Sequence, residues 1–295
     1  MKHVFILNPT AGSYHNHDIE KMIHQYASSK HIDHEIIYTD HIHHGKQLAS
    51  LYDADTTIYA IGGDGSAFDV LNGLKNSSMA IIPCGTGNDF YRMISKRYDI
   101  KDMIIDTING KEINIDYGKC NDHYFLNCTT MGIDATVNEL VCRLLKKTII
   151  PKPFLYAISA IICVLNPKPF EFEITLDDKN IKSKALLIAI MNGKYYGNGV
   201  APLKEANIQD GLFDICIIDD LPFYKLLYYL PMYFMGKAHK LKYVHIYKAK
   251  KINIKVKEDI ICQSDGETFI TNNISIINNH MKLKFRVPNK YGENQ

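Results

Sequence analysis

The feature that most constrains the fold of this chain is a repeated pairing of short apolar runs with turns in its first third. HVFIL at 3–7 leads into NPTAG, TTIYAI at 56–61 leads into GGDGS, and MAII at 79–82 leads into PCGTGND. A fourth run, EIIY at 35–38, leads into Thr39. Short continuous apolar runs are typical of strands that are covered on both faces, as in a parallel sheet.

Helical patterns fill the intervals between these runs, over 18–29, 46–52 and 66–75. A strand followed by a glycine turn, a helix and the next strand is the pattern of α/β proteins. We therefore expect an α/β lobe over residues 1–117, to which the C-terminal residues 286–295 return.

The spacing of apolar residues changes after about residue 115, where the strand candidates alternate between apolar and polar positions. KINIKVK at 251–257 places Ile252, Ile254 and Val256 on one face, which is typical of an antiparallel sheet with one wet face. The other strand candidates are 171–177, 185–191, 213–219, 274–278 and 282–287. The pattern predicts an antiparallel β-sandwich lobe over 118–285.

Composition excludes several classes of protein. The chain has 295 residues with 34 Lys and Arg against 32 Asp and Glu, a net charge of +2, which argues against general nucleic-acid binding. Its longest apolar run, 154–165, is well short of the roughly 20 residues of a spanning helix, and its N-terminus does not resemble a signal peptide. The seven cysteines lack CxxC spacing, so a disulfide framework is not expected. These features predict a soluble, intracellular protein.

GGDGS at 62–66 is the sharpest chemical signal, because it follows a buried strand and opens a helix. Adjacent glycines let backbone N–H groups approach a phosphate, and a helix N-terminus favours negative charge. Asp64 would then serve a metal or hold the turn. The alternative is an ordinary strand-to-helix turn capped by Ser66. PCGTGND at 83–89 repeats the pattern one strand later, and consecutive strand ends face the same crevice in open α/β sheets, which favours a phosphate site.

Five motifs in order along the chain resemble the diacylglycerol kinase catalytic-domain family, in particular its bacterial lipid kinases. They are NPTAG at 8–12, GGDGS at 62–66, PCGTGND at 83–89, the stretch from GNGVAP at 197–202 to DGLFD at 210–214, and DGE at 265–267. The resemblance implies a nucleotide-binding α/β lobe of the kind shared with NAD kinases, followed by a β-sandwich lobe. It also implies ATP and Mg²⁺ as cofactors.

The resemblance further implies roles for individual residues. The nucleotide would be contacted by Asn8, Pro9, Thr10, Ala11, Gly12, Thr39, Gly62, Gly63, Asp64, Gly65, Ser66, Gly85, Thr86, Asn88 and Asp89. Asp64 and Asp89 would hold a catalytic Mg²⁺ through water. Asp210, with backbone carbonyls near Asn207 and Leu212, would hold a structural Mg²⁺, an ion that prefers oxygen ligands.

Asp265 or Glu267 would be the general base, with Asp265 favoured. The alternative for Asp265-Gly266 is a plain hairpin turn, because Asp-Gly is a common turn pair. Relatives often carry a basic residue after Gly12, whereas this chain has SYHNH at 13–17, which would weaken a phosphate contact from that loop.

The resemblance implies an ATP-dependent kinase that phosphorylates the free hydroxyl of diacylglycerol or a similar lipid, giving phosphatidic acid or its analogue. The alternatives are a kinase of a soluble acceptor such as NAD and an inactive nucleotide- or lipid-binding regulator. The acidic set argues against a regulator, because a pure binder needs no base.

The apolar helix candidates 154–165 and 221–235, which have lysines beside them, suit a membrane interface; packing against the β lobe is the alternative. We expect a cytoplasmic protein that associates transiently with the inner face of the membrane, where its lipid substrate lies. An exposed strand could pair two copies as a homodimer.

Histidines concentrate near the N-terminus, and the spacing of His41, His43 and His44 suggests a metal site. No matching cluster of cysteines or carboxylates is evident near them in the sequence, so solvated loop histidines are expected instead.

Overall fold

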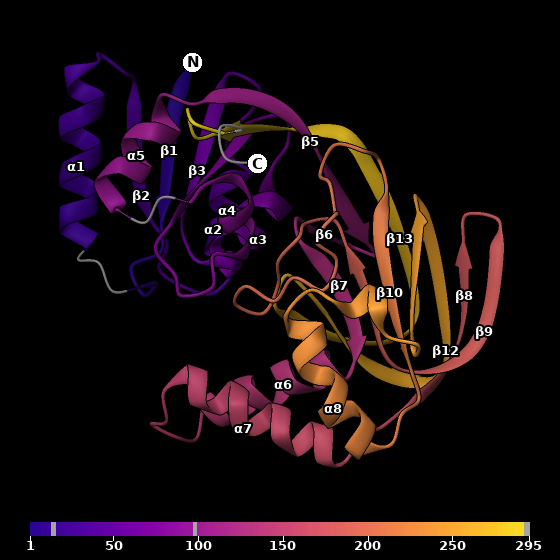
Figure 1. Ribbon diagram of the computed structural model, residues 1–295. Coiled ribbons are helices and arrows are strands. Elements are labelled where there is room, and N and C mark those ends of the chain that lie inside the picture. The colour runs from indigo at the N-terminus through magenta and orange to yellow at the C-terminus, as the bar shows by residue number, and fades with distance from the viewer. Residues whose placement is uncertain (13–15, 97–98, 292–295) are drawn as a thin grey trace. The chain divides into compact units, whose positions relative to one another are not determined.

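The computed structural model describes residues 1–12, 16–96 and 99–291 (Figure 1). The chain forms two compact units. The first contains residues 1–117, 195–199 and 280–295, and the second contains residues 118–194 and 200–279. Two long strands, β5 (Lys111–Cys120) and β13 (Glu267–Val287), contribute residues to both units.

The first unit is built on a parallel sheet with the strand order β13-β4-β3-β1-β2. Its inner strands are buried along their whole length, as continuous apolar runs predict. The strands are β1 (Lys2–Leu7), β2 (His34–Tyr38), β3 (Thr56–Gly62), β4 (Ser78–Pro83) and the end of β13. The parallel register places Val4 beside Ile58, and Ile58 beside Met79. The predicted α/β organisation is confirmed.

Helices connect these strands, and they pack in pairs, α1 with α5 and α2 with α3. They are α1 (Asn16–Ser29), α2 (His44–Ala49), α3 (Asp64–Gly73), α4 (Asp89–Ile94) and α5 (Ile100–Ile108). The sequence patterns did not predict the short helices α4 and α5. Asp99 caps α5 by accepting the Asp102 N–H at 3.0 Å.

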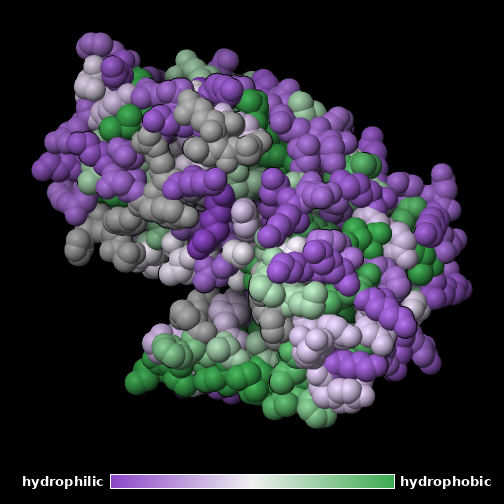
Figure 2. All heavy atoms as spheres, viewed as in Figure 1, coloured by the Kyte–Doolittle hydropathy of each residue, from purple (hydrophilic) through white to green (hydrophobic). Residues whose placement is uncertain are grey.

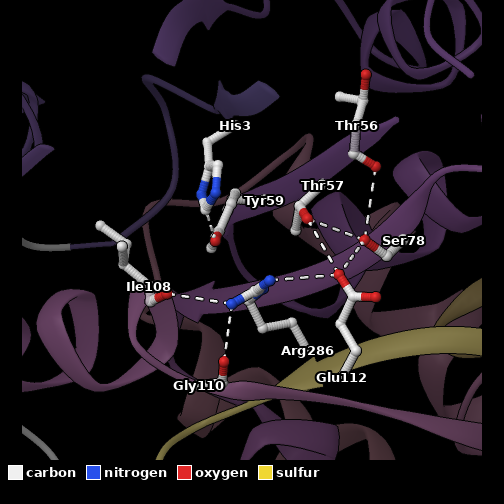
Figure 3. Close-up of polar contacts among 9 residues, drawn as sticks. All are labelled: His3, Thr56, Thr57, Tyr59, Ser78, Ile108, Gly110, Glu112 and Arg286. Atoms are coloured by element: carbon white, nitrogen blue, oxygen red, sulfur yellow. Dashed lines mark hydrogen bonds and ion pairs between the residues drawn. The ribbon is translucent and has the colours of Figure 1, made fainter. Parts of the chain in front are cut away.

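Polar side chains at the amino ends of the strands form a hydrogen-bond network (Figure 3). Arg286 donates to the carbonyl oxygens of Ile108 and Gly110 at 3.2 and 2.7 Å, and its guanidinium lies 3.3 Å from a Glu112 carboxylate oxygen. The same Glu112 oxygen accepts the Ser78 hydroxyl at 2.9 Å. The network therefore ties the end of β13 to the starts of β4 and β5.

His3 extends this polar edge into the core. Its Nδ1 lies 2.8 Å from the Tyr59 hydroxyl, and the two rings stack at 5.5 Å (Figure 3). Burial, followed by the charge of Arg286, lowers the pKa of His3 to about 4. The fold therefore requires the neutral imidazole at this position.

The second unit is built from antiparallel strands. They are β6 (His123–Phe125), β7 (Cys128–Gly132), β8 (Phe170–Leu176), β9 (Lys179–Met191), β10 (Phe213–Asp219), β11 (Val244–Ala249), β12 (Lys251–Ser264) and most of β13. β7 pairs with β9, β9 with β8, β8 with β12 and β12 again with β7, so the pairing closes on itself. One apolar core, which includes Phe125, Phe213 and Ile252, fills the unit.

The prediction of separate strands at 274–278 and 282–287 is wrong, because both segments belong to the single strand β13. Polar residues between them interrupt the apolar alternation in the sequence. In the structure the backbone continues with a left-handed residue at Met281, whose N–H donates to Asp116 at 2.7 Å. A side chain of β5 therefore accepts the backbone N–H at this irregular position of β13.

Three helices lie together in the second unit (Figure 1). They are α6 (Ile133–Leu145), α7 (Lys152–Leu165) and α8 (Phe223–Phe234), and a 3₁₀ turn follows at Ala238–Lys240. α6 packs on β7, β9 and β12, whereas α7 packs on α6 and α8 packs on α7. Among the described residues, no helix combines the length and apolarity needed to cross a membrane.

Candidate active site

Loops from three strands of the first unit meet at the carboxyl edge of its parallel sheet. Gly12, with φ of +83°, lies so close to the Cys84 carbonyl that a Cβ there would overlap it. A Cβ at Gly85 would lie 2.6 Å from the Cα of Gly63. The NPTAG loop, the GGDGS turn and the PCGTGND loop therefore need glycine for close backbone approach. The positions of the three motifs at strand ends predicted that these loops would meet.

Side chains of the first two loops are hydrogen-bonded to each other. Asn8 Nδ2 donates to the Ser66 hydroxyl at 3.3 Å. Asn8 Oδ1 accepts the Thr10 N–H at 3.0 Å and its hydroxyl at 2.8 Å. These contacts fix the loop after β1 against the start of α3.

Asp64 is the first residue of α3, and its side chain turns toward the next loop. One carboxylate oxygen accepts the Asp89 N–H, the first N–H of α4, at 2.8 Å. Asn88, which precedes the helix in a left-handed conformation, donates through its side chain to the Gly85 carbonyl at 2.6 Å. Asp64 thus holds the two glycine loops together, one of the roles expected for it.

Asp89 is nearly buried and binds the short segment 195–199, which belongs to the first unit. Its carboxylate accepts the N–H groups of Asn198 at 3.0 Å and Gly199 at 2.7 Å. Arg92 Nε lies 4.0 Å from Asp89 and donates to the Gly87 carbonyl at 2.8 Å.

The electrostatics of this edge suit a cation. Burial, followed by the charge of the neighbouring Asp89 carboxylate, raises the pKa of Asp64 to about 6. Burial likewise raises the pKa of Asp89. Two nearby carboxylates in a partly dehydrated site resist a second negative charge, and a divalent cation with oxygen ligands relieves that repulsion. The residues present therefore fit a divalent ion.

The remaining residues expected at the nucleotide lie on the same loops or at their roots. The Thr39 N–H donates to the Leu7 carbonyl at 2.9 Å at the end of β2, and the Ala11 N–H donates to the Asn8 carbonyl at 3.2 Å. Gly65 and Thr86 are exposed, and Pro9 and Gly62 flank the turns. Of the segment that lacks a basic residue, positions 13–15 fall outside the described residues.

Sequence reasoning missed the contacts of Arg92, Asn198 and Gly199 at this edge. The last two lie in the GNGVAP stretch, which carried the family resemblance but suggested no partner. Arg92 donates to Asn198 Oδ1 at 3.1 Å. Only the tertiary structure brings this stretch back to the first unit.

Asp265 and Glu267, the two residues expected to supply the base, lie in the second unit in very different surroundings. Asp265, with φ of 47°, begins a turn, and its carboxylate accepts the N–H groups of Leu126, Asn127 and Cys128 at 2.6, 2.9 and 3.0 Å. Glu267, the first residue of β13, is exposed. The hairpin turn weighed as the alternative is therefore present.

The stretch expected to hold a structural metal, Asn207 to Leu212, forms tight turns in the second unit. The Asn207 side chain accepts the Gln209 N–H, and Asp210 Oδ1 accepts the Leu212 N–H, both at 3.0 Å. The oxygen atoms expected to bind a metal there are the backbone carbonyls of Asn207 and Leu212 and the second carboxylate oxygen of Asp210.

A lysine already supplies positive charge to this stretch. Lys248 Nζ lies 3.3 Å from Asp210 Oδ2 and 3.3 Å from Asp214 Oδ1. Burial raises the pKa of Asp214, and its Oδ2 is buried with no hydrogen-bond partner among the described residues. The unpartnered Asp214 oxygen is suited to bind a metal ion. Because Lys248 already contacts both carboxylates, however, an ion fits here less well than at Asp64 and Asp89.

His41 and His43 are exposed, as expected for solvated histidines, whereas His44 is partly buried at the start of α2 and Asp40 lies beside it. His44 Nδ1 lies 2.6 Å from Asp40, and His41 Nε2 lies 3.4 Å from it. The three side chains could reach one ion. Exposed groups of this kind are common without a metal, and nothing else at the surface points to a ligand.

Comparison with known proteins agrees with both units. Residues 2–120 match the diacylglycerol kinase catalytic domain, and residues 127–276 match the YegS C-terminal NAD kinase beta sandwich-like domain. These matches define a kinase of two domains, and the predicted β-sandwich is confirmed. The chain belongs to the diacylglycerol kinase catalytic-domain family, a family of lipid kinases.

Individual relatives cover between 75% and 97% of the chain. The protein named "Putative lipid kinase YtlR" from Bacillus subtilis is 28% identical over 96% of this chain and 98% of its own length. A diacylglycerol kinase from Staphylococcus saprophyticus is 29% identical over 75% of this chain and 72% of its own. A crystal structure titled "putative diacylglycerol kinase" from Bacillus anthracis is 26% identical, with a TM-score of 0.80 over 97% of each chain.

Proposed function

We propose that this protein is an ATP-dependent kinase that transfers the γ-phosphoryl group to the free hydroxyl of diacylglycerol or a similar membrane lipid. The product is phosphatidic acid or its analogue. The observation that carries the proposal is the meeting of three glycine loops around Asp64 and Asp89, in a chain whose relatives are named diacylglycerol kinase and lipid kinase.

The three loops supply the phosphate-binding part of the site. Their glycines leave the backbone uncovered, and phosphate oxygens are well bound by backbone N–H groups at such turns. Thr10, Ser66 and Thr86 add hydroxyl groups on the same edge. These residues bind and orient the triphosphate of ATP.

Asp64 and Asp89 would hold a divalent cation, which we take to be Mg²⁺. When bound, such an ion neutralises charge on the phosphate oxygens. Burial raises the pKa of both carboxylates, and a bound cation would favour their ionised forms. Asp64 also keeps the loops together through the Asp89 N–H, so its role is partly positional.

Glu267 is the better candidate for the general base. Asp265 is occupied by three backbone N–H groups, and a carboxylate held in this way is a weak proton acceptor. In the proposed step the lipid hydroxyl oxygen forms a bond to the γ-phosphorus, the bond from phosphorus to the ADP oxygen breaks, and the hydroxyl proton passes to Glu267. Asp265 is then a positioning residue that shapes the turn before Glu267.

The test is transfer of labelled phosphate from ATP to a panel of lipids in mixed micelles, with NAD as a soluble acceptor for comparison. We expect labelling of diacylglycerol or a related lipid alcohol. Labelling of NAD without any lipid, or labelling of no acceptor at all, would refute the proposal.

Two variants distinguish the roles of the Glu267 and Asp265 carboxylates. Glu267→Gln should lower the transfer rate about 10²–10⁴-fold at unchanged stability, because only proton transfer is lost. Asp265→Asn should lower both the melting temperature and the rate, because the amide cannot accept all three N–H groups as a carboxylate does. An unchanged rate in Glu267→Gln would return the role of base to Asp265.

A further inference from the structure

The exposed face of α7 is more apolar than its buried face. Its outward residues follow helical spacing and are Phe154, Ile158, Ile161, Ile162 and Leu165. Its buried residues are Leu155, Ser159, Cys163 and Val164. An amphipathic helix that only packs on a protein core has the opposite arrangement. The outward side chains of α7 are therefore suited to contact an apolar environment other than the protein's own core.

α8 continues this face. Phe223, Tyr224, Leu227 and Tyr228 are exposed, whereas Leu226 and Tyr233 are buried. α8 contacts α7, so the two exposed sides belong to the same part of the second unit. Figure 2 shows apolar residues gathered at the end of the molecule where Figure 1 places α7. We call these exposed residues of the two helices the α7–α8 face.

The two segments that carry the α7–α8 face are basic, although Glu139, Glu171 and Asp220 lie directly beyond their ends. Residues 140–170 and 221–243 contain no Asp or Glu. Exposed Lys and Arg side chains in these segments are Arg143, Lys146, Lys147, Lys168, Lys237, Lys240 and Lys242. An apolar face flanked mainly by basic side chains complements a membrane surface, which has anionic headgroups outside and hydrocarbon inside.

We propose that the α7–α8 face binds the surface of an anionic lipid bilayer, with α7 and α8 lying in the interface. The apolar side chains enter the acyl region, the tyrosines lie at headgroup level and the basic border contacts anionic headgroups. This inference deepens the proposed function, on which its biological purpose rests, because a kinase docked in this way meets its acceptor in the membrane.

A second copy of the chain suits this face less well. In a two-fold symmetric contact each patch meets itself, so each basic border would face another basic border. Like charges facing each other disfavour association. The same border is favourable against anionic lipid.

The absence of tryptophan from the chain allows a direct test. Phe154→Trp places a single reporter on the face at a position that is 66% exposed, and Ile270→Trp places one on β13 of the same unit at 69%. With vesicles of phosphatidylglycerol, Phe154→Trp should show blue-shifted emission that brominated lipids quench, and Ile270→Trp should show neither. No shift in Phe154→Trp, or equal shifts in both, would overturn the proposal.

Two further variants test each part of the face. Ile161→Ser with Ile162→Ser should lower the vesicle partition coefficient about tenfold or more. Lys146→Glu with Lys147→Glu should weaken binding to phosphatidylglycerol, most clearly at low salt, and leave binding to neutral phosphatidylcholine unchanged. If the emission shift appears with rising protein concentration in the absence of lipid, a second copy covers the face and the proposal is wrong.

Vesicle binding needs no ATP, so it is independent of the reaction. Binding without phosphoryl transfer would refute the proposed function alone. Phosphoryl transfer in mixed micelles, with no binding to anionic vesicles, would refute the docking surface alone.

Discussion

The two edges of the parallel sheet in the first unit carry polar residues of opposite kinds. At the amino edge, Arg286 donates to a neighbouring carbonyl and to Glu112, which accepts the Ser78 hydroxyl (Figure 3). At the carboxyl edge, Asp64 and Asp89 are held by backbone N–H groups, and both have raised pKa values. The amino edge pairs Arg286 with Glu112, whereas at the carboxyl edge Arg92 lies 4.0 Å from one of the two carboxylates.

This difference separates structural from functional polar residues. A closed network gains nothing from a ligand and loses stability when one member is removed. A buried acidic pair with unmet demand for a cation costs stability and is retained where it binds something. Substitutions at the amino edge should therefore change stability, and those at the carboxyl edge should change activity.

The largest effect is expected at the carboxyl edge from Asp64→Asn. The amide still accepts the Asp89 N–H and removes a buried charge, but it binds a divalent cation poorly. The rate of phosphoryl transfer to lipid should fall about 10²–10³-fold, with little change in melting temperature. A rate within a few-fold of wild type would show that this edge has no special demand for charge.

At the amino edge, Arg286→Met should lower the free energy of unfolding by about 3 kcal/mol, because Glu112 and two carbonyl oxygens lose their partner. Denaturant unfolding measures the loss, and the rate per folded molecule should be unchanged. Arg92→Met is the matched control at the other edge, where stability should change less. Equal losses in both variants would break the contrast between the edges.

Low pH should destabilise the folded protein at the amino edge of the sheet, through protonation of His3. Its folded pKa of about 4 is below its ordinary value, so the unfolded chain binds the proton more tightly and stability falls as the pH drops from about 6.5 to 4. The loss should be about 2–3 kcal/mol by urea unfolding at several pH values. His3→Phe, which cannot titrate, should remove this part of the pH dependence; an identical profile would contradict it.

The second unit sharpens the contrast on a smaller scale, because Lys248 supplies a cation to Asp210 and Asp214. Lys248→Met should cost about 1–2 kcal/mol, an effect reduced by the exposure of the lysine. Added Mg²⁺ should recover part of the loss, since the variant leaves two carboxylates free to bind it. The exposed Lys250→Met is the control, and an equal loss there would remove any special role for Lys248.

Local patterns were enough to predict the strands and turns of the first unit. Continuous apolar runs ending in glycine located β1, β3 and β4 to within a residue or two, because buried parallel strands leave a strong local signal. The same patterns missed α4 and α5, which are short. They also divided β13 at 279–281, where the Met281 N–H donates to Asp116, a contact that no local pattern encodes.

The sequence by itself determined which residues could carry chemistry, because glycine turns after buried strands place GGDGS and PCGTGND at one edge. Only the tertiary structure decided what each side chain does there. Asp89 binds residues more than a hundred positions away, Asp265 is occupied by the N–H groups of a distant loop, and Lys248 lies between two carboxylates. Hydrogen-bond partners depend on distances between segments remote in the chain, and local periodicity holds no information about such distances.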